Sequence, residues 1–122
     1  MMRTLHRICA FLLIALGVVH TALTPVFYGR LSPGAMWFAG SGLAMIFVGF
    51  LNVAFGRVVG RDAVIRALCY AANLTTLVFG VLIAVVDGEP QVLFGLVLIT
   101  VMTATAFMLK GRPAEDAPIQ KP

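Results

Sequence analysis

Polar side chains within long apolar runs are the residues of this sequence best suited to chemistry. One of them is His20, in the first run. Ionisable groups are expensive to bury in a membrane, so those found there often have a function. An imidazole at this position can ligate haem or a metal, or can donate to a quinone or a lipid headgroup, with Trp37 near the same end. A haem held between two helices needs a second axial ligand, and His6 falls at the opposite end. We therefore favour a structural His20, bonded to a neighbouring helix or to interfacial water.

Two asparagines and a tyrosine form the second candidate group. Tyr70 and Asn73 share one helix face at this spacing, and Asn52 belongs to the preceding apolar run. Asparagines in a bilayer often join helices, for about 0.6 kcal/mol per hydrogen bond. Alternatively, these side chains line a polar cavity open to the cytoplasm, but we favour the structural interpretation. The hypothetical ligand-binding residues are thus His20, Trp37, Asn52, Tyr70 and Asn73.

Motifs for catalysis are missing from the sequence. It has no Ser-His-Asp constellation, no glycine-rich phosphate loop and no zinc-ligand spacing. We therefore predict no catalytic residue, no metal site and no cofactor. The acidic residues nearest the apolar runs, Asp62, Asp87 and Glu89, lie at their ends, so an ion-coupled transporter would lack its mid-membrane carboxylate. A small transporter is the function with least support.

The composition predicts a protein dissolved in lipid. Of the 122 residues, 61% are hydrophobic and only 11% are charged, whereas soluble domains carry about 25% charged residues. The mean hydropathy is +1.01. The net charge of +4 does not indicate a nucleic-acid partner, because the basic residues lie at the ends of apolar runs instead of gathering on one polar face. The predicted partner is the lipid bilayer.

Four apolar runs must position the candidate residues. They cover residues 8–28, 35–55, 63–86 and 92–109, and about 18 to 20 residues cross a bilayer as a helix. Backbone groups in lipid must bond within their own segment, and the alternation typical of a membrane barrel is missing. Because the connections are short, we predict an all-α, polytopic membrane four-helix bundle of up-down-up-down topology. The transmembrane domain is expected over 1–111, followed by a disordered cytoplasmic tail over 112–122.

Basic residues give the expected orientation. Eight belong to the side of the bilayer that carries both termini, against one, Arg30, on the other side. Short loops rich in Lys and Arg stay in the cytoplasm. We therefore expect a multi-pass protein of the cell inner membrane with both termini cytoplasmic. The eight residues are Arg3, Arg7, Arg57, Arg61, Arg66, Lys110, Arg112 and Lys121.

Small residues recur at seven-residue intervals in the second run, at Ala35, Gly42, Gly49 and Gly56. Small side chains let helices approach closely in lipid. The first run has a shorter series that includes Gly17, so we predict that these two helices pack along the small residues. A homodimer contact through the second helix is the alternative.

The segment Leu16-Gly17-Val18-Val19-His20, then Thr24-Pro25 and Met36-Trp37-Phe38, resembles small uncharacterised bacterial inner-membrane proteins. The four-span layout is similar to that of DoxX-like proteins. This resemblance implies a link to membrane redox or quinone-dependent complexes. From the residues themselves we expect a non-catalytic accessory component, a homo-oligomer or part of a larger membrane complex. A binder of a hydrophobic molecule, lipid or quinone, is the alternative.

Overall fold

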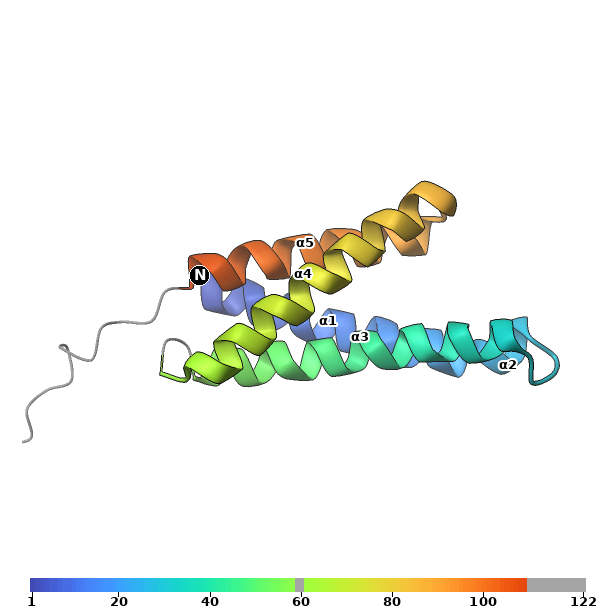
Figure 1. Cartoon of the computed structure of the whole chain (residues 1–122), viewed down its shortest axis with the longest axis horizontal. Helices are drawn as coiled ribbons and strands as arrows, with labels where there is room; N and C mark the ends of the chain where they lie inside the picture. The colour runs from blue at the N-terminus through green and yellow to red at the C-terminus, as the bar shows by residue number, and fades with distance from the viewer. Residues whose placement is uncertain (59–60, 110–122) are drawn as a thin grey trace, which may run out of the picture.

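The described part of the chain folds into four long helices and one short helix (Figure 1). The computed structural model describes residues 1–58 and 61–109. Each long helix is long and apolar enough to cross a membrane, the first together with the short helix that follows it. The predicted all-α membrane bundle is therefore confirmed. The helices are α1 (Met2–Ala22), α2 (Thr24–Phe27), α3 (Pro33–Arg57), α4 (Ala63–Val86) and α5 (Pro90–Met108).

The break between α1 and α2 falls at Leu23, two residues before Pro25. The amide of Leu23 still donates to the Val19 carbonyl at 2.9 Å, so the chain remains helical up to that point. Pro25 has no N–H and cannot continue the series of hydrogen bonds, which interrupts the helix. Helical geometry resumes when the Phe27 amide donates to the Leu23 carbonyl at 3.1 Å. The first span is thus one rod with a break near its end.

Side-chain caps start α3 and α4. Ser32 Oγ accepts a hydrogen bond from the Ala35 amide at 3.2 Å. Asp62 Oδ1 accepts from the amides of Val64 and Ile65, at 2.9 and 3.0 Å. The first amides of a helix lack partners within it, so a side-chain oxygen at this position stabilises the start of the helix.

Replacing the cap of α4 gives a first prediction. Asp62→Ala is expected to lower the free energy of unfolding by about 1 kcal/mol, because two amides lose their acceptor. Asp62→Asn keeps a side-chain oxygen and should lose less. Unfolding in mixed micelles, followed by circular dichroism, measures both variants. An asparagine variant as unstable as the alanine variant would rule out capping as the cause.

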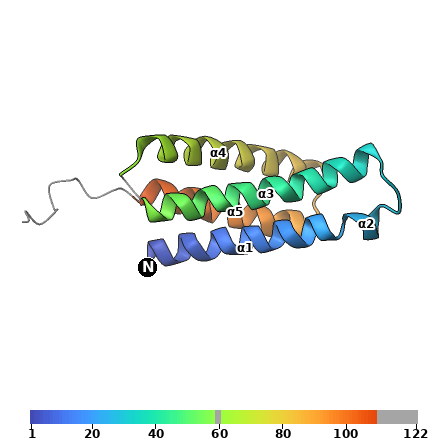
Figure 2. The ribbon, with the colours of Figure 1, turned by 90° about the horizontal axis from the view of Figure 1, so that it is seen from below.

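The helices are arranged in a ring in the order α1, α3, α4, α5. Helix α1 contacts α3 and α5, while α4 contacts α5 and α3. Figure 2 shows the four long helices running side by side. The N-terminus, the last turn of α3 and the first turn of α4 lie at one end (Figure 1). We call it the basic end, because Arg3, Arg7, Arg57 and Arg61 belong to it. The opposite end carries α2 and the turn from α4 to α5.

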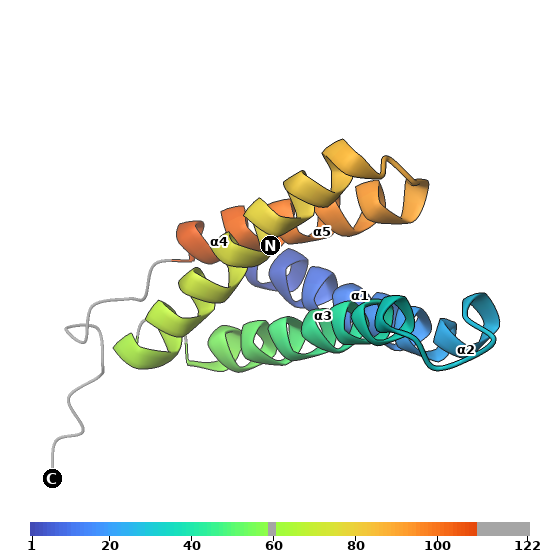
Figure 3. The same ribbon diagram turned by 45° about the vertical axis from the view of Figure 1, so that its right-hand side comes forward.

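Helices α1 and α3 form one pair and α4 and α5 the other, and the two pairs diverge toward the opposite end (Figures 1 and 3). Helix α4 shows the consequence in its burial. Its buried residues are Cys69 and Asn73, both in the half nearer the basic end. Val85 and Val86, near the opposite end, are 80% and 88% exposed. The ring is therefore held together mainly at the basic end.

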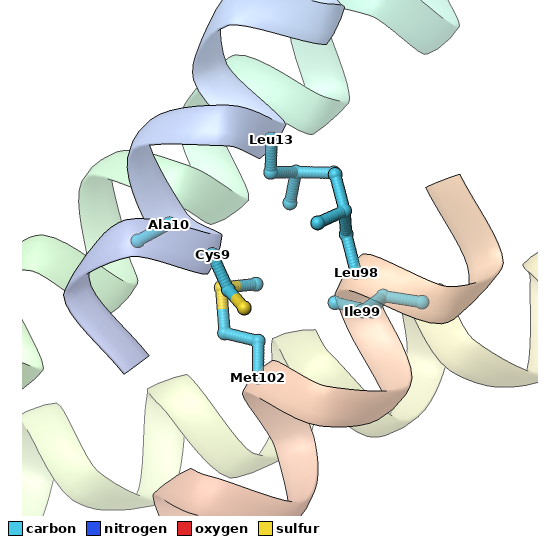
Figure 4. Packing of buried hydrophobic residues seen from close by; sticks show 6 residues of the cluster. All are labelled: Cys9, Ala10, Leu13, Leu98, Ile99 and Met102. Atoms are coloured by element: carbon cyan, nitrogen blue, oxygen red, sulfur yellow. The ribbon is translucent and has the colours of Figure 1, made fainter. Parts of the chain in front are cut away.

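The core is a thin strip between helices. Its main cluster joins α1 to α5 through Leu13, Cys9 and their neighbours (Figure 4). A second cluster joins α3, α4 and α5 through Phe55, Cys69 and Ala106. Most large apolar side chains instead point outward, as expected where lipid is the solvent. The main cluster is Cys9, Ala10, Leu13, Leu98, Ile99 and Met102.

The helix boundaries differ from the expected spans at one important place. Helix α1 begins at Met2, six residues before the expected start of the first span, and so includes His6. Helices α3, α4 and α5 cover the other three expected spans closely. The expected disordered tail, 112–122, lies outside the described residues.

Candidate functional site

Asn52 of α3 and Asn73 of α4 face each other in the half of the bundle nearer the basic end. Asn52 Nδ2 donates to Asn73 Oδ1 at 2.7 Å, and Asn73 Nδ2 donates to Asn52 Oδ1 at 2.9 Å. Asn52 Nδ2 also donates to the Val48 carbonyl at 2.8 Å, and its Oδ1 accepts from Cys69 Sγ at 3.2 Å. Both asparagines are 0% exposed. The Asn52 side chain thus uses both its donors and both acceptor positions within the protein.

His6 extends this arrangement to the other two helices. Its Nε2 lies 3.3 Å from the Asn52 carbonyl oxygen, and its Nδ1 lies 2.9 Å from Thr105 Oγ1 of α5. A carbonyl only accepts, so Nε2 carries a proton. The Thr105 hydroxyl also lies 2.9 Å from the Val101 carbonyl oxygen and 3.0 Å from the Met102 carbonyl oxygen, so His6 Nδ1 shares this hydroxyl with the backbone of α5. His6 is 1% exposed and its ring contacts that of Phe55, with ring centres 5.5 Å apart.

These side chains form one polar cluster, defined here as His6, Asn52, Cys69, Asn73 and Thr105. Each of the four long helices contributes at least one member. A polar group buried in a medium without water is costly unless it is bonded, and a fully bonded network fixes how its helices are placed. The cluster therefore acts as a hydrogen-bonded joint at the basic end.

Tyr70 is close to the polar cluster but bonds elsewhere. Its hydroxyl donates to the Ala106 carbonyl at 3.3 Å, and its ring stacks on Phe107 with centres 4.3 Å apart. The hypothetical ligand-binding residues Asn52, Tyr70 and Asn73 are thus neighbours whose polar groups bond within the protein. Tyr70 and Asn73 therefore belong to a helix joint, whereas Asn52 belongs both to that joint and to the lining of the cavity described below.

His20 lies at the opposite end, against α3. Its Nε2 is 3.0 Å from Ser41 Oγ, and the Ser41 hydroxyl donates to the Phe38 carbonyl at 2.8 Å. Phe38 also stacks on the imidazole, with ring centres 3.8 Å apart. Trp37, grouped with His20 as a hypothetical ligand-binding residue, is instead 79% exposed. The contacts of His20 thus join α1 to α3.

The small residues of α3 divide into two groups. A Cβ at Gly17 of α1 would lie 2.6 Å from the Gly42 carbonyl oxygen, and a Cβ at Gly49 would lie 3.0 Å from the Ala10 carbonyl. Ala35 is also buried. Gly56 differs, since a Cβ there would meet only His6 Cδ2, at 3.9 Å. Gly42 and Gly49 therefore face α1 within the chain and are not free for a homodimer contact.

A cavity of about 570 Å³ opens beside Gly56 at the basic end. It lies between the first turns of α1 and the last turns of α3. Arginines line it, together with apolar side chains and two members of the polar cluster. The lining residues are Arg3, Thr4, His6, Arg7, Ile8, Phe11, Asn52, Val53, Gly56 and Arg57.

No family model, curated protein or solved structure matches this chain. The site must therefore be interpreted from its own residues. Within residues 1–58 and 61–109, no three His, Cys, Asp or Glu side chains gather as metal ligands would.

Sequence reasoning missed His6 and Thr105 as members of the polar cluster. Arg3 and Arg7 suggested that the membrane span begins at residue 8, which placed His6 outside it. A usable signal was present, because His6, Cys9 and Leu13 follow helical spacing on one face. The long side chains of the two arginines can reach the interface from a helix that continues past them.

Proposed function

We propose that the chain is a non-catalytic component of a membrane assembly, either as an accessory subunit or as a homo-oligomer. The observation that carries this proposal is the polar cluster. Its five side chains, drawn from four helices, bond to one another or to the backbone. Groups of the kind that bind ligands or transfer protons in other membrane proteins are here occupied in joining helices. The cluster therefore supports a structural role.

The exposed half of α4 supports the assembly role. The buried residues of this helix end at Asn73, and the thirteen residues over 74–86 include none. Large apolar side chains such as Val78, Phe79 and Leu82 are 58% to 61% exposed there. Apolar side chains gain little from leaving lipid, so packing contacts decide whether such a face meets lipid or another helix.

The proposed location is the cell inner membrane, with both termini in the cytoplasm. Its support is the distribution of charge. Arg3, Arg7, Arg57 and Arg61 all belong to the basic end, whereas Arg30, Asp87 and Glu89 belong to the opposite end. The positive-inside rule assigns the basic end to the cytoplasm.

Photo-crosslinking in native membranes tests the assembly role. Leu82 of α4 is 58% exposed and Leu12 of α1 is 43% exposed, and each is replaced in turn by benzoylphenylalanine. We expect a discrete protein adduct from position 82 and a weaker one or none from position 12, because α4 has the less covered face. Mass spectrometry then identifies either a second copy of this chain or another membrane protein. Adducts with lipid alone at both positions would contradict the proposal.

Binding of a hydrophobic molecule, a lipid or quinone, is the second candidate function, and a DoxX-like relationship would imply it. The observation in its favour is the cavity beside Arg3, Arg7 and Arg57, whose wall is partly apolar.

A further inference from the structure

The cavity at the basic end carries a strong positive charge. Among the residues that the structure describes, its lining contains Arg3, Arg7 and Arg57 but no Asp or Glu. Three guanidinium groups around one hollow repel one another, and an anion between them relieves that repulsion. Arginine also presents a planar fork of N–H donors that matches the oxygens of a phosphate. The lining therefore favours a phosphate-bearing ligand.

The cavity also has an apolar part. Ile8 and Phe11 of α1 and Val53 of α3 belong to its lining. From Arg3 to Phe11 the helix rises by about 12 Å, whereas the headgroup layer on each side of a bilayer is about 5 to 8 Å thick. The cavity therefore extends beyond the headgroups to the level of the acyl chains. A ligand that fills it has both a charged and an apolar portion.

Gly56 keeps the cavity open. A Cβ at this position would meet only His6 Cδ2, at 3.9 Å, so helix packing does not require a glycine there. A helix with glycine at an interior position is less stable than the same helix with alanine there. We explain the glycine at position 56 by the cavity, because a larger side chain there would fill the space between α1 and α3. The volume of about 570 Å³ lies within the range of about 300 to 1,000 Å³ of small-molecule sites.

We propose that this cavity binds the phosphate of an anionic phospholipid from the leaflet at the basic end. The arginines contact the phosphate, and Ile8, Phe11 and Val53 contact the first part of an acyl chain. A soluble phosphate ester shares the phosphate chemistry, but it would leave the apolar wall without a partner. Basic hollows between transmembrane helices are suited to such headgroups. The site does not depend on the proposed assembly role.

Binding of fluorescent phosphatidylglycerol to the full-length protein in a neutral detergent tests the proposal. We expect phosphatidylglycerol to bind more tightly than phosphatidylcholine with the same acyl chains, since only the former carries a net negative charge. Millimolar inorganic phosphate and glycerol phosphate should displace little of the lipid. Equal affinity for the two lipids would overturn the proposal, and so would complete displacement by soluble phosphate, which would indicate a soluble ligand.

Matched variants locate the binding to the cavity. Arg57→Gln should weaken phosphatidylglycerol binding about fivefold, whereas Arg61→Gln, which changes a basic residue outside the lining, should weaken it less. Gly56→Leu fills the cavity and should abolish the preference for phosphatidylglycerol. Gly40→Leu is its control, because Gly40 has nothing within 4 Å of an added Cβ. Two results would show that general surface charge attracts the lipid: an equal loss of affinity in the two arginine variants, or an unchanged preference for phosphatidylglycerol in Gly56→Leu.

Discussion

Gly42→Ala is expected to lower the free energy of unfolding by about 1 to 3 kcal/mol, the usual cost of overpacking a close contact. The added Cβ would meet the side-chain oxygen of Thr21, and it would lie 2.9 Å from both the Thr21 amide nitrogen and the Gly17 carbonyl oxygen. Two of these three atoms belong to the backbone, so a change of rotamer cannot relieve the contact. Helices α1 and α3 must separate locally, and the loss of their close packing is the physical reason for the effect.

Gly40→Ala is the matched control for this prediction. Gly40 lies two residues earlier on the same helix, and an added Cβ there meets nothing within 4 Å. Alanine is the better helix former, by about 1 kcal/mol, so this variant should be neutral or slightly more stable. Unfolding of both proteins in mixed micelles, followed by circular dichroism, provides the comparison. Equal stability of the two variants would show that α1 and α3 are not in backbone contact at Gly42.

The architecture could be predicted from the sequence because it depends on length and hydropathy. Each span is long enough to cross a bilayer, and lipid permits few other backbone arrangements. The pairing of α1 with α3 also follows from a local pattern, since Gly42 and Gly49 recur at seven residues and a short connection brings the two helices together. These features need no knowledge of distant contacts.

The polar cluster could be predicted only in part. Asn52 and Asn73 stand out as amides within apolar runs, but their pairing depends on the relative depth and rotation of two helices. His6 and Thr105 are 99 residues apart, and nothing local connects them. The two arginines flanking the histidine also placed the expected start of the first span at residue 8, after His6. Side-chain partners across helices are a property of the packed bundle, which the sequence does not show directly.

Gly56 shows how a regular pattern can mislead. It continues the seven-residue series of α3, and the series predicts contact with α1. In the structure the contact is lost at this position, because the cavity lies between the two helices there. Periodicity indicates which face of a helix a residue occupies. It does not say whether the neighbouring helix is still within reach.

Asn73→Leu should have an effect as large as that of Gly42→Ala. The variant removes both hydrogen bonds between the asparagines. Asn52 Oδ1 still accepts from Cys69 Sγ and Asn52 Nδ2 still donates to the Val48 carbonyl, but the second N–H of Asn52 is left without an acceptor. An unsatisfied buried polar group costs about 1 to 3 kcal/mol. Native membrane-protein hydrogen bonds average about 0.6 kcal/mol, so the unsatisfied N–H of Asn52, and not the lost bonds alone, accounts for most of the expected loss of stability.

The double variant Asn52→Leu, Asn73→Leu separates these two contributions. If the cost arises from one unsatisfied amide N–H, removing both amides should be less destabilising than the sum of the single changes, because two apolar groups of similar shape need no partner. Thr100→Val is the control. Thr100 is exposed and donates to the Leu96 carbonyl of its own helix, at 2.7 Å. The Thr100→Val variant should therefore change the free energy of unfolding by no more than about 0.5 kcal/mol. Strictly additive effects in the double variant would mean that Asn52 and Asn73 stabilise the bundle independently. The polar cluster would then not be a joint between α3 and α4, and the structural role proposed for the chain would lose its main support.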